Sequence, residues 1–308
     1  MLKQLIRLFR HGGLAGLALC CSLAAAPWAQ AQDAAALRAH HVALHDALAA
    51  NAFQRPLVIE SSEPVGGLQG DIYARIEEPF AVVERALQNS DHWCDILMLH
   101  LNVKQCLAND TPPGTTLGLI IGSKYDQPLA DAYRFEFAYH VVDAGADYLQ
   151  VVLSADQGPL ATSHYRIVLE VVALDAGRSF LHMSYAYDYG FVARVAMEGY
   201  LATIGRNKVG FSVVGHKPDG QPQYIGKMRG VVERNTMRYY LAIEAYLGAL
   251  SLPPALQFER RLTDWFAGIE RYPTQLHELE LGEYLALKRG QMQRQPARDQ
   301  SALLTQNP

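Results

Sequence analysis

Cysteine, basic charge and long apolar runs are all scarce in this chain. Four cysteines occur among the 308 residues, and 27 lysines and arginines are outnumbered by 31 aspartates and glutamates. Beyond the first 31 residues, no segment reaches the roughly 18 consecutive apolar residues that a membrane-spanning helix needs. The mildly acidic composition, without a basic stripe, argues against a nucleic-acid partner. We therefore expect neither a transmembrane segment in the mature chain nor a nucleic-acid site.

Sequence motifs of common catalytic sites are also missing. The chain has no Gly-x-Ser-x-Gly, His-Glu-x-x-His, phosphate-loop or Gly-x-Gly-x-x-Gly pattern. Gly66, Gly67 and Gly70 precede or enter a predicted strand, so they indicate a turn. His41 and His45 could face one metal ion from a helix, but no third ligand at a metal-site spacing accompanies them. We expect no metal and no cofactor.

The first 31 residues have the composition of a cleavable export signal. Three basic residues and no acidic one precede the apolar stretch Leu14–Leu23, which is too short to span a bilayer. Ala29-Gln30-Ala31 is the small-x-small pattern that a signal peptidase accepts. We predict cleavage after Ala31 and a periplasmic or secreted protein. Loss of three basic residues would change the formal charge from −4 to −7.

Two cysteine pairs need separate interpretations. A lipid anchor on Cys20 or Cys21 is disfavoured, because Leu19 and Cys20 are poor residues for the position before a lipid-modified cysteine. Cys94 and Cys106 remain after cleavage, twelve apart across a predicted turn. In an oxidising compartment this spacing favours a structural disulfide over two free thiols. His92 beside Cys94 is therefore not interpreted as a catalytic base.

The N-terminal half opens with helices and one strand. Residues 33–52 are rich in alanine with leucines at helical spacing, and they predict a helix; 54–64 is a connector. Alternation predicts a strand over 70–77, and Pro79 then begins a helix. Ser90 or Asp91 can cap a second short helix.

From Leu101 the apolar period changes to two, which predicts an antiparallel meander. Turns with Gly or Asp at their centres separate its later strands. The expected strands are 101–106, 115–123, 133–142, 148–155, 164–174 and 179–188. One face of the sheet is strongly aromatic and must be covered.

Helices dominate the rest of the chain. Apolar spacing predicts helices over 191–204 and 230–250, the latter with Glu233, Arg234 and Arg238 away from its apolar stripe. Pro253-Pro254 marks a boundary, beyond which we expect helices around 258–269 and 276–287. The polar sequence from Gln291 predicts a disordered tail.

This order resembles the helix-grip fold of the START-like (SRPBCC) superfamily, in its exported bacterial members. Residues 91–97 and 185–190 carry the similarity most closely. The resemblance implies an α+β fold, a curved antiparallel sheet wrapped on a long C-terminal helix with added helices at both ends, and an apolar pocket between sheet and helix. We expect the following organisation: a signal peptide at 1–31, an N-terminal helix and connector at 32–65, a ligand-binding domain at 66–250, a helical extension at 251–290 and a disordered tail at 291–308.

Candidate ligand-binding residues lie on the strands and the closing helix. Tyr139, Tyr185, Tyr187 and Tyr239 each offer a ring to pack and a hydroxyl to orient a ligand; the alternative is that these rings fill a solid core. His182 projects from the opposite side of its strand and becomes a contact if that side is the concave one. The sequence leaves the choice of face open.

Three functions remain open. The first is a periplasmic binding protein for a lipid or other hydrophobic small molecule, driven by apolar burial. The second is a cell-envelope structural or interaction protein that docks a partner through residues 255–290. The third is a cyclase- or hydrolase-type enzyme on the same fold, for which the sequence shows no catalytic residues.

Overall fold

The structure, a computed structural model, describes residues 34–203 and 205–295, without the side chains of residues 160, 192, 193, 196 and 200. The predicted signal peptide, 1–31, and the tail beyond Gln295 lie outside the described residues. None of the described helices is long and apolar enough to cross a membrane.

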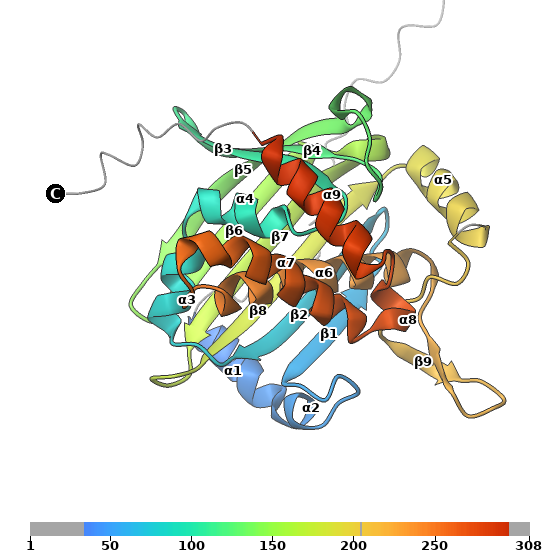
Figure 1. Cartoon of the computed structure of the whole chain (residues 1–308). Coiled ribbons are helices and arrows are strands. Elements are labelled where there is room, and N and C mark those ends of the chain that lie inside the picture. Colours follow the sequence, from blue (N-terminus) through green and yellow to red (C-terminus); the bar gives the residue numbers. More distant parts are fainter. Residues whose placement is uncertain (1–33, 204, 296–308) are drawn as a thin grey trace, which may run out of the picture. The chain divides into compact units, whose positions relative to one another are not determined.

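The central element is an eight-stranded antiparallel sheet in the order β1-β2-β8-β7-β6-β5-β4-β3 (Figure 1). From β3 to β8 each strand pairs with the next along the chain, as the meander predicts, and β2 then pairs with β8. The bounds are β1 Leu57–Ser62, β2 Gly67–Ile76, β3 Val103–Thr111, β4 Gly114–Ile121, β5 Tyr133–Ala144, β6 Tyr148–Gln157, β7 Thr162–Ala173 and β8 Ser179–Tyr189.

Two strand regions differ from the sequence predictions. The expected connector 54–64 contains β1, which pairs with β2 in the register Leu57↔Ala74. Its short apolar run has no clear alternation, so only pairing at the sheet edge defines it as a strand. A two-stranded hairpin, β9 (Val213–His216) and β10 (Pro222–Tyr224), was also not predicted.

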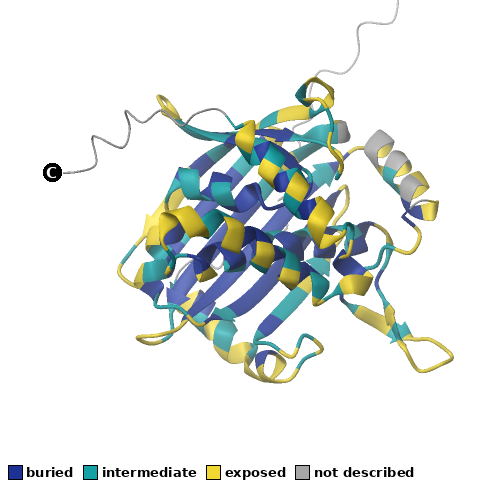
Figure 2. Cartoon of the chain, in the orientation of Figure 1, coloured by how far each residue is buried: buried dark blue, intermediate teal, exposed yellow. Residues whose placement is uncertain are grey.

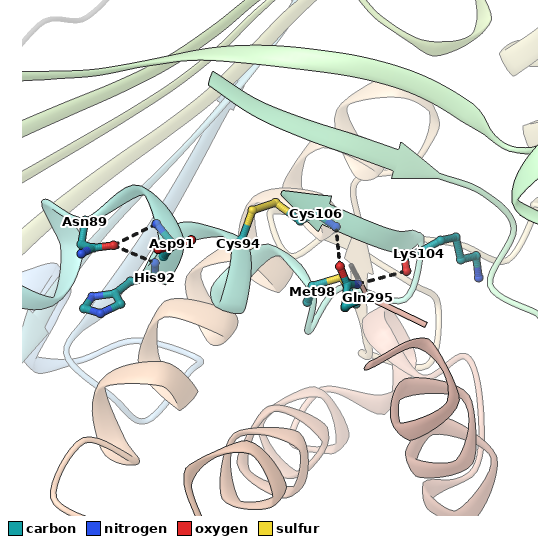
Figure 3. Close-up of a disulfide and its surroundings, with 8 residues drawn as sticks. All are labelled: Asn89, Asp91, His92, Cys94, Met98, Lys104, Cys106 and Gln295. Carbon is teal, nitrogen blue, oxygen red and sulfur yellow. Dashed lines mark hydrogen bonds between the residues drawn. A yellow bond between two sulfur atoms is a disulfide. The ribbon is translucent and has the colours of Figure 1, made fainter. Parts of the chain in front are cut away.

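Two short helices, α3 (Phe80–Leu87) and α4 (Ser90–Leu97), follow β2 as expected. The cap of α4 is Asn89, not Ser90 or Asp91: the Asn89 side chain accepts hydrogen bonds from the backbone N–H groups of Asp91 and His92 (Figure 3). Asn89 stands one residue before the predicted cap and satisfies two otherwise unpaired helix donors.

The predicted disulfide is confirmed. Cys94 on α4 is bonded to Cys106 on β3, with Cα atoms 5.2 Å apart, within the usual range. Figure 3 shows the bond crossing from the helix to the strand, next to Gln295 at the end of the described chain. It joins a helix to the edge strand of the sheet.

The long helix α6 (Lys227–Gly248) packs across one face of the sheet. Gly70 on β2 makes this contact close, because a Cβ at that position would collide with Thr236 of α6. Helix α7 (Pro254–Glu270) lies against the other side of α6. Glu233, Arg234 and Arg238, expected away from the apolar stripe, are buried rather than solvated. Glu233 accepts hydrogen bonds from the backbone N–H groups of Phe211 and Ser212, and the two arginines donate to Glu278.

The opposite face of the sheet is partly covered by the N-terminal helices α1 (Ala34–Ala43) and α2 (His45–Ala49), which contact β1, β7 and β8, whereas the outer side of β5 stays exposed. Leu37 and Leu48 of these helices pack with Tyr73, Tyr148 and Phe180 in a second, smaller core. Figure 2 shows the central strands β2 and β8 buried and the outward sides of the helices exposed. The aromatic face predicted from the sequence is therefore the one that α6 covers.

The remaining helices are α5 (Phe191–Ala202), α8 (Pro273–Leu276) and α9 (Leu281–Gln293). The last helix extends past the expected end at 287, and Gln291, where the tail was predicted to start, is buried. The reason is tertiary: the ammonium of Lys288, itself buried, donates to the Gln291 side chain and to the carbonyls of His100 and Val103.

The fold prediction is confirmed by this topology. The chain is α+β, with the antiparallel sheet gripped by the long helix α6 and with added helices at both ends. The covered aromatic face between sheet and α6 is the place to look for a ligand site.

Candidate functional site

Four tyrosines meet between the sheet and α6. Tyr165 comes from β7, Tyr185 and Tyr187 from one face of β8, and Tyr239 from α6; we name these four the tyrosine cluster. Ring centroids lie 5.3 Å apart for Tyr185 and Tyr239, 5.1 Å for Tyr165 and Tyr187, and 5.6 Å for Tyr185 and Tyr187. Three of the four predicted tyrosines therefore belong to one group.

The hydroxyls of the tyrosine cluster differ in their partners. That of Tyr165 is hydrogen-bonded to the Thr162 hydroxyl at 2.8 Å. Those of Tyr185, Tyr187 and Tyr239 have no hydrogen-bond partner among the described residues. Burial raises the pKa of each of these three phenols, so all stay protonated at neutral pH. None of the three hydroxyls is fully enclosed by the described residues, so each can still reach solvent. The interface therefore offers three neutral donors that no protein group uses.

Tyr139 lies on the same face but outside the tyrosine cluster. Its hydroxyl donates to the Leu87 carbonyl at 3.3 Å, and the Trp93 indole donates to the same oxygen at 2.7 Å. These bonds place the Tyr139 side chain against α3 and α4, where its polar group is already used. Tyr139 therefore serves well as a matched comparison for the other tyrosines.

His182 lies on the opposite face of the sheet, under α1. Its Nδ1 is 2.8 Å from a Glu170 carboxylate oxygen, and its Nε2 is 3.0 Å from one of Asp71. Tyr148 donates to Glu170 at 2.6 Å, and Tyr73 stacks on the imidazole with centroids 4.4 Å apart. The structure thus separates His182 from the tyrosines by the thickness of the sheet.

The two carboxylates keep this buried imidazole charged. Burial by itself lowers the pKa of His182, but the hydrogen bonds to Asp71 and Glu170 outweigh it and raise the pKa to about 9. A cation between two carboxylates stabilises the packing of β2, β7 and β8 on one another. His182, Asp71 and Glu170 are all buried, and they join three neighbouring strands to one another.

Two surface grooves lie elsewhere. One, of about 350 Å³, runs along α9 and is lined by Lys124, Tyr125, Leu279, Leu287 and Arg294, among others. The other, of about 310 Å³, lies beside the disulfide and the end of α9. At the tyrosine cluster itself the rings contact one another, and Phe135, Tyr165 and Tyr239 are only half-buried.

A charged group next to the tyrosine cluster has no counterpart in the sequence predictions. Glu278, between α8 and α9, is in contact with Lys124, Lys208, Arg234 and Arg238. The sequence indicates only one part of this group: Arg234 and Arg238 are four residues apart, so they lie on the same side of a helix. Glu278 and the two lysines come from separate segments, so no spacing rule could have joined them.

No protein-family model and no curated protein matches the chain. Solved structures do show similarity. A START superfamily protein from Mycobacterium smegmatis has 11% identity and a TM-score of 0.30, covering 49% of this chain and 92% of its own. Norcoclaurine synthase from Thalictrum flavum, in complex with dopamine and hydroxybenzaldehyde, has 14% identity and a TM-score of 0.31, covering 48% and 91%.

The protein Ara h 8.0201 has 13% identity and a TM-score of 0.35, covering 60% of this chain and 99% of its own. These proteins are similar to part of the chain in fold. The assignment of the helix-grip architecture rests on the strand order and on the packing of α6 described above.

Proposed function

We propose that this START-like helix-grip protein is exported and binds a hydrophobic small molecule, such as a lipid, at the tyrosine cluster between the sheet and α6. The observation that carries the proposal is the set of three tyrosine hydroxyls, on Tyr185, Tyr187 and Tyr239, that have no partner among the described residues. A ligand that accepts a hydrogen bond from one of them would gain about 0.5–1.5 kcal/mol from that bond.

The surroundings suit an apolar ligand. Phe135 and Phe137 on β5 extend the aromatic wall, with ring centroids 6.0 and 6.5 Å from Tyr165. Small-molecule sites combine such walls with a few polar groups that set orientation. Apolar burial would supply about 25 cal/mol per Å² of ligand surface. The half-buried rings of Phe135 and Tyr165 mark the side from which we expect a ligand to enter.

Export is the second part of the proposal. It is supported by the predicted signal at 1–31 and by the disulfide between Cys94 and Cys106, which requires an oxidising compartment to persist. Mass spectrometry of the protein from a periplasmic fraction should give a chain that starts at Gln32. An uncleaved chain that remains in the cytoplasm would contradict this part.

The binding test begins with protein purified from the periplasm. We expect organic extraction to release a hydrophobic compound, and we expect the fluorescent probe N-phenyl-1-naphthylamine to bind the emptied protein. Tyr185→Phe and Tyr239→Phe should each release most of the extracted compound without loss of stability, because no protein hydrogen bond is broken. Absence of both a compound and probe binding would overturn the proposal.

Tyr139→Phe is the matched control. It also removes one hydroxyl from the same face of the sheet, but that hydroxyl bonds Leu87 and lies outside the tyrosine cluster. This variant should lose about 0.5–1.5 kcal/mol of stability and keep its ligand. If Tyr139→Phe and Tyr185→Phe have the same effect on the extracted compound, the tyrosine cluster is not the site.

A further inference from the structure

One carboxylate near the tyrosine cluster is surrounded by four cations. The ammonium nitrogens of Lys124 and Lys208 lie 2.9 and 2.8 Å from Glu278 carboxylate oxygens, and a guanidinium nitrogen of Arg238 lies 3.1 Å away. Arg234 also donates to the same carboxylate. We name Lys124, Lys208, Arg234 and Arg238 the cationic cluster.

The charges in this group do not balance. Among the described residues, Lys124, Arg234 and Arg238 form no ion pair with any carboxylate other than Glu278. Burial and the neighbouring Arg234 lower the pKa of Arg238 to about 10, which shows how closely the two guanidiniums are confined. Lys124, Arg234 and Arg238 by themselves carry more positive charge than one glutamate neutralises, so the group attracts further negative charge.

Two buried nitrogens at this place have no hydrogen-bond partner among the described residues: Nε of Arg238 and Nε2 of His100. Both residues are more than nine-tenths buried. The His100 ring stacks on Tyr239, with centroids 5.0 Å apart. His100 therefore links the cationic cluster to the tyrosine cluster, and unpaired donors are present where the two meet.

The outer side of the cationic cluster is accessible. The lysine side chains are each 29% exposed, whereas those of Arg234 and Arg238 are 7% and 6% exposed. Lys124 and Leu279 also line the groove of about 350 Å³ along α9. Glu278 itself belongs to the short connection 277–280 between α8 and α9, so its position depends on a few residues of chain.

We propose that the cationic cluster is the head-group site for an anionic ligand, and that Glu278 occupies it in the structure as an internal counter-ion. A carboxylate or phosphate has the charge and oxygen geometry that paired arginines bind best. The ligand anion would take the place of the Glu278 carboxylate on Arg234 and Arg238. This inference rests on the proposed function, because the tyrosine cluster would hold the apolar body of the same molecule.

The first test examines the anion site without any apolar ligand. Glu278→Gln removes the internal counter-ion, and inorganic phosphate is compared with chloride at equal ionic strength. We expect the melting temperature of Glu278→Gln to lie below that of the wild type in chloride and to rise several degrees in phosphate, with a smaller rise for the wild type. Glu259→Gln, which removes an exposed partner of Arg289, is the control.

An equal phosphate effect on Glu278→Gln, Glu259→Gln and the wild type would overturn the inference. If Glu278→Gln does not fold, even in phosphate, the second test decides with the wild-type protein alone.

The second test compares two ligands with the same chain, dodecanoate and dodecanol, on the wild-type protein by calorimetry. We expect dodecanoate to bind about tenfold more tightly, the effect of one charge-assisted hydrogen bond. Arg238→Gln should abolish this preference, while Arg289→Gln, an exposed arginine, should keep it.

The outcomes separate the two proposals. Equal binding of dodecanoate and dodecanol would overturn the anionic head group and leave the proposed function standing. Binding of neither would count against the tyrosine cluster as an apolar site, and the phosphate measurement would then decide whether the cationic cluster takes anions.

Discussion

His182 is held between Asp71 and Glu170 on the face of the sheet that α1 covers. Its pKa in the folded protein, about 9, lies above the ordinary histidine value of 6.5. A raised pKa means that the folded state binds the proton more tightly than the unfolded chain does. The resulting stabilisation is complete below about pH 6.5 and disappears as the pH rises through about 9.

A variant without the imidazole should therefore show a specific pH dependence. We expect His182→Gln to be less stable than the wild type at about pH 6, and we expect the difference to shrink by up to about 3 kcal/mol on going to about pH 9.5. Urea denaturation of both proteins at several pH values measures this difference in the free energy of unfolding. A difference that stays constant over this range would show that folding does not raise the pKa of His182.

The stability of His182→Gln has to be compared with that of the wild type at each pH, because other groups also titrate between about pH 6 and 9.5. Burial lowers the pKa of Lys104 to about 8, and this contributes a change of stability of opposite sign. Subtraction of the two curves removes that contribution. His277, an exposed histidine beside Glu270, is the comparison. The hydrogen bond to Glu270 raises the pKa of His277 as well, so His277→Gln should change the pH dependence in the same direction but by less, because solvent screens this pair.

At the scale of elements, the contact between β2 and α6 depends on a glycine. A Cβ at Gly70 would collide with the side chain of Thr236 and would lie 3.4 Å from Val232. Thr236 is completely buried and its hydroxyl is bonded to the Val232 carbonyl, so it has no room to turn away. The contact between Gly70 and Thr236 therefore determines how closely α6 packs on the sheet.

Gly70→Ala should separate α6 from the sheet and lower the free energy of unfolding by about 1–3 kcal/mol, the usual cost of overpacking. Gly118→Ala on β4 is the matched control, because its Cβ would meet only the Leu107 carbonyl oxygen at 3.8 Å. Chemical denaturation of both variants gives the comparison. Equal effects would mean that strand propensity, and not the packing of α6, explains the result.

The disulfide between α4 and β3 closes a short loop, with its cysteines twelve apart in sequence. Replacing both cysteines by serine should cost about 2–4 kcal/mol, mainly because the unfolded chain gains freedom. Urea denaturation measures the loss, and a thiol assay on the denatured exported protein should find no free thiol. An unchanged midpoint in the double variant would contradict this expectation.

At the scale of the whole molecule, the C-terminal helices share the main core. Trp265 of α7 donates to the Arg238 carbonyl on α6, and Tyr284 of α9 donates to the Leu99 carbonyl. Both side chains are buried. Docking of an envelope partner through residues 255–290 stays a prediction, and it would have to use the outward sides of these helices.

Two truncations test how far the fold extends. A chain that ends at Gln295 should be as stable as the full chain within about 0.5 kcal/mol, because the sequence beyond this residue shows no apolar periodicity that would add to the core. A chain that ends at His277 loses Tyr284 and Lys288 and leaves the carbonyls of His100 and Val103 without their donor. We expect it to lose more than about 3 kcal/mol. Thermal and chemical denaturation of the two truncated chains and of the full chain measure these differences in stability.

Much of the fold could be predicted because its signals are local. Period-two alternation and turn residues located β3 to β8, and helical spacing located α3 to α7, since each depends on neighbours a few residues away. The helix-grip arrangement was predicted from the resemblance of this order of elements to the START-like superfamily. The disulfide was predicted from two closely spaced cysteines in an exported chain. β1 and the hairpin β9–β10 were missed because only pairing with another strand defines them.

The sequence by itself determined the strands of the meander, the longer helices, their order and the aromatic side of the strands. Only the tertiary structure decided which face α6 covers, and with it that Tyr185, Tyr187 and Tyr239 gather while His182 lies behind the sheet. The cationic cluster around Glu278 likewise exists only in three dimensions. Alternation divides side chains into two faces without saying which is covered, because burial depends on contacts between segments far apart in the chain.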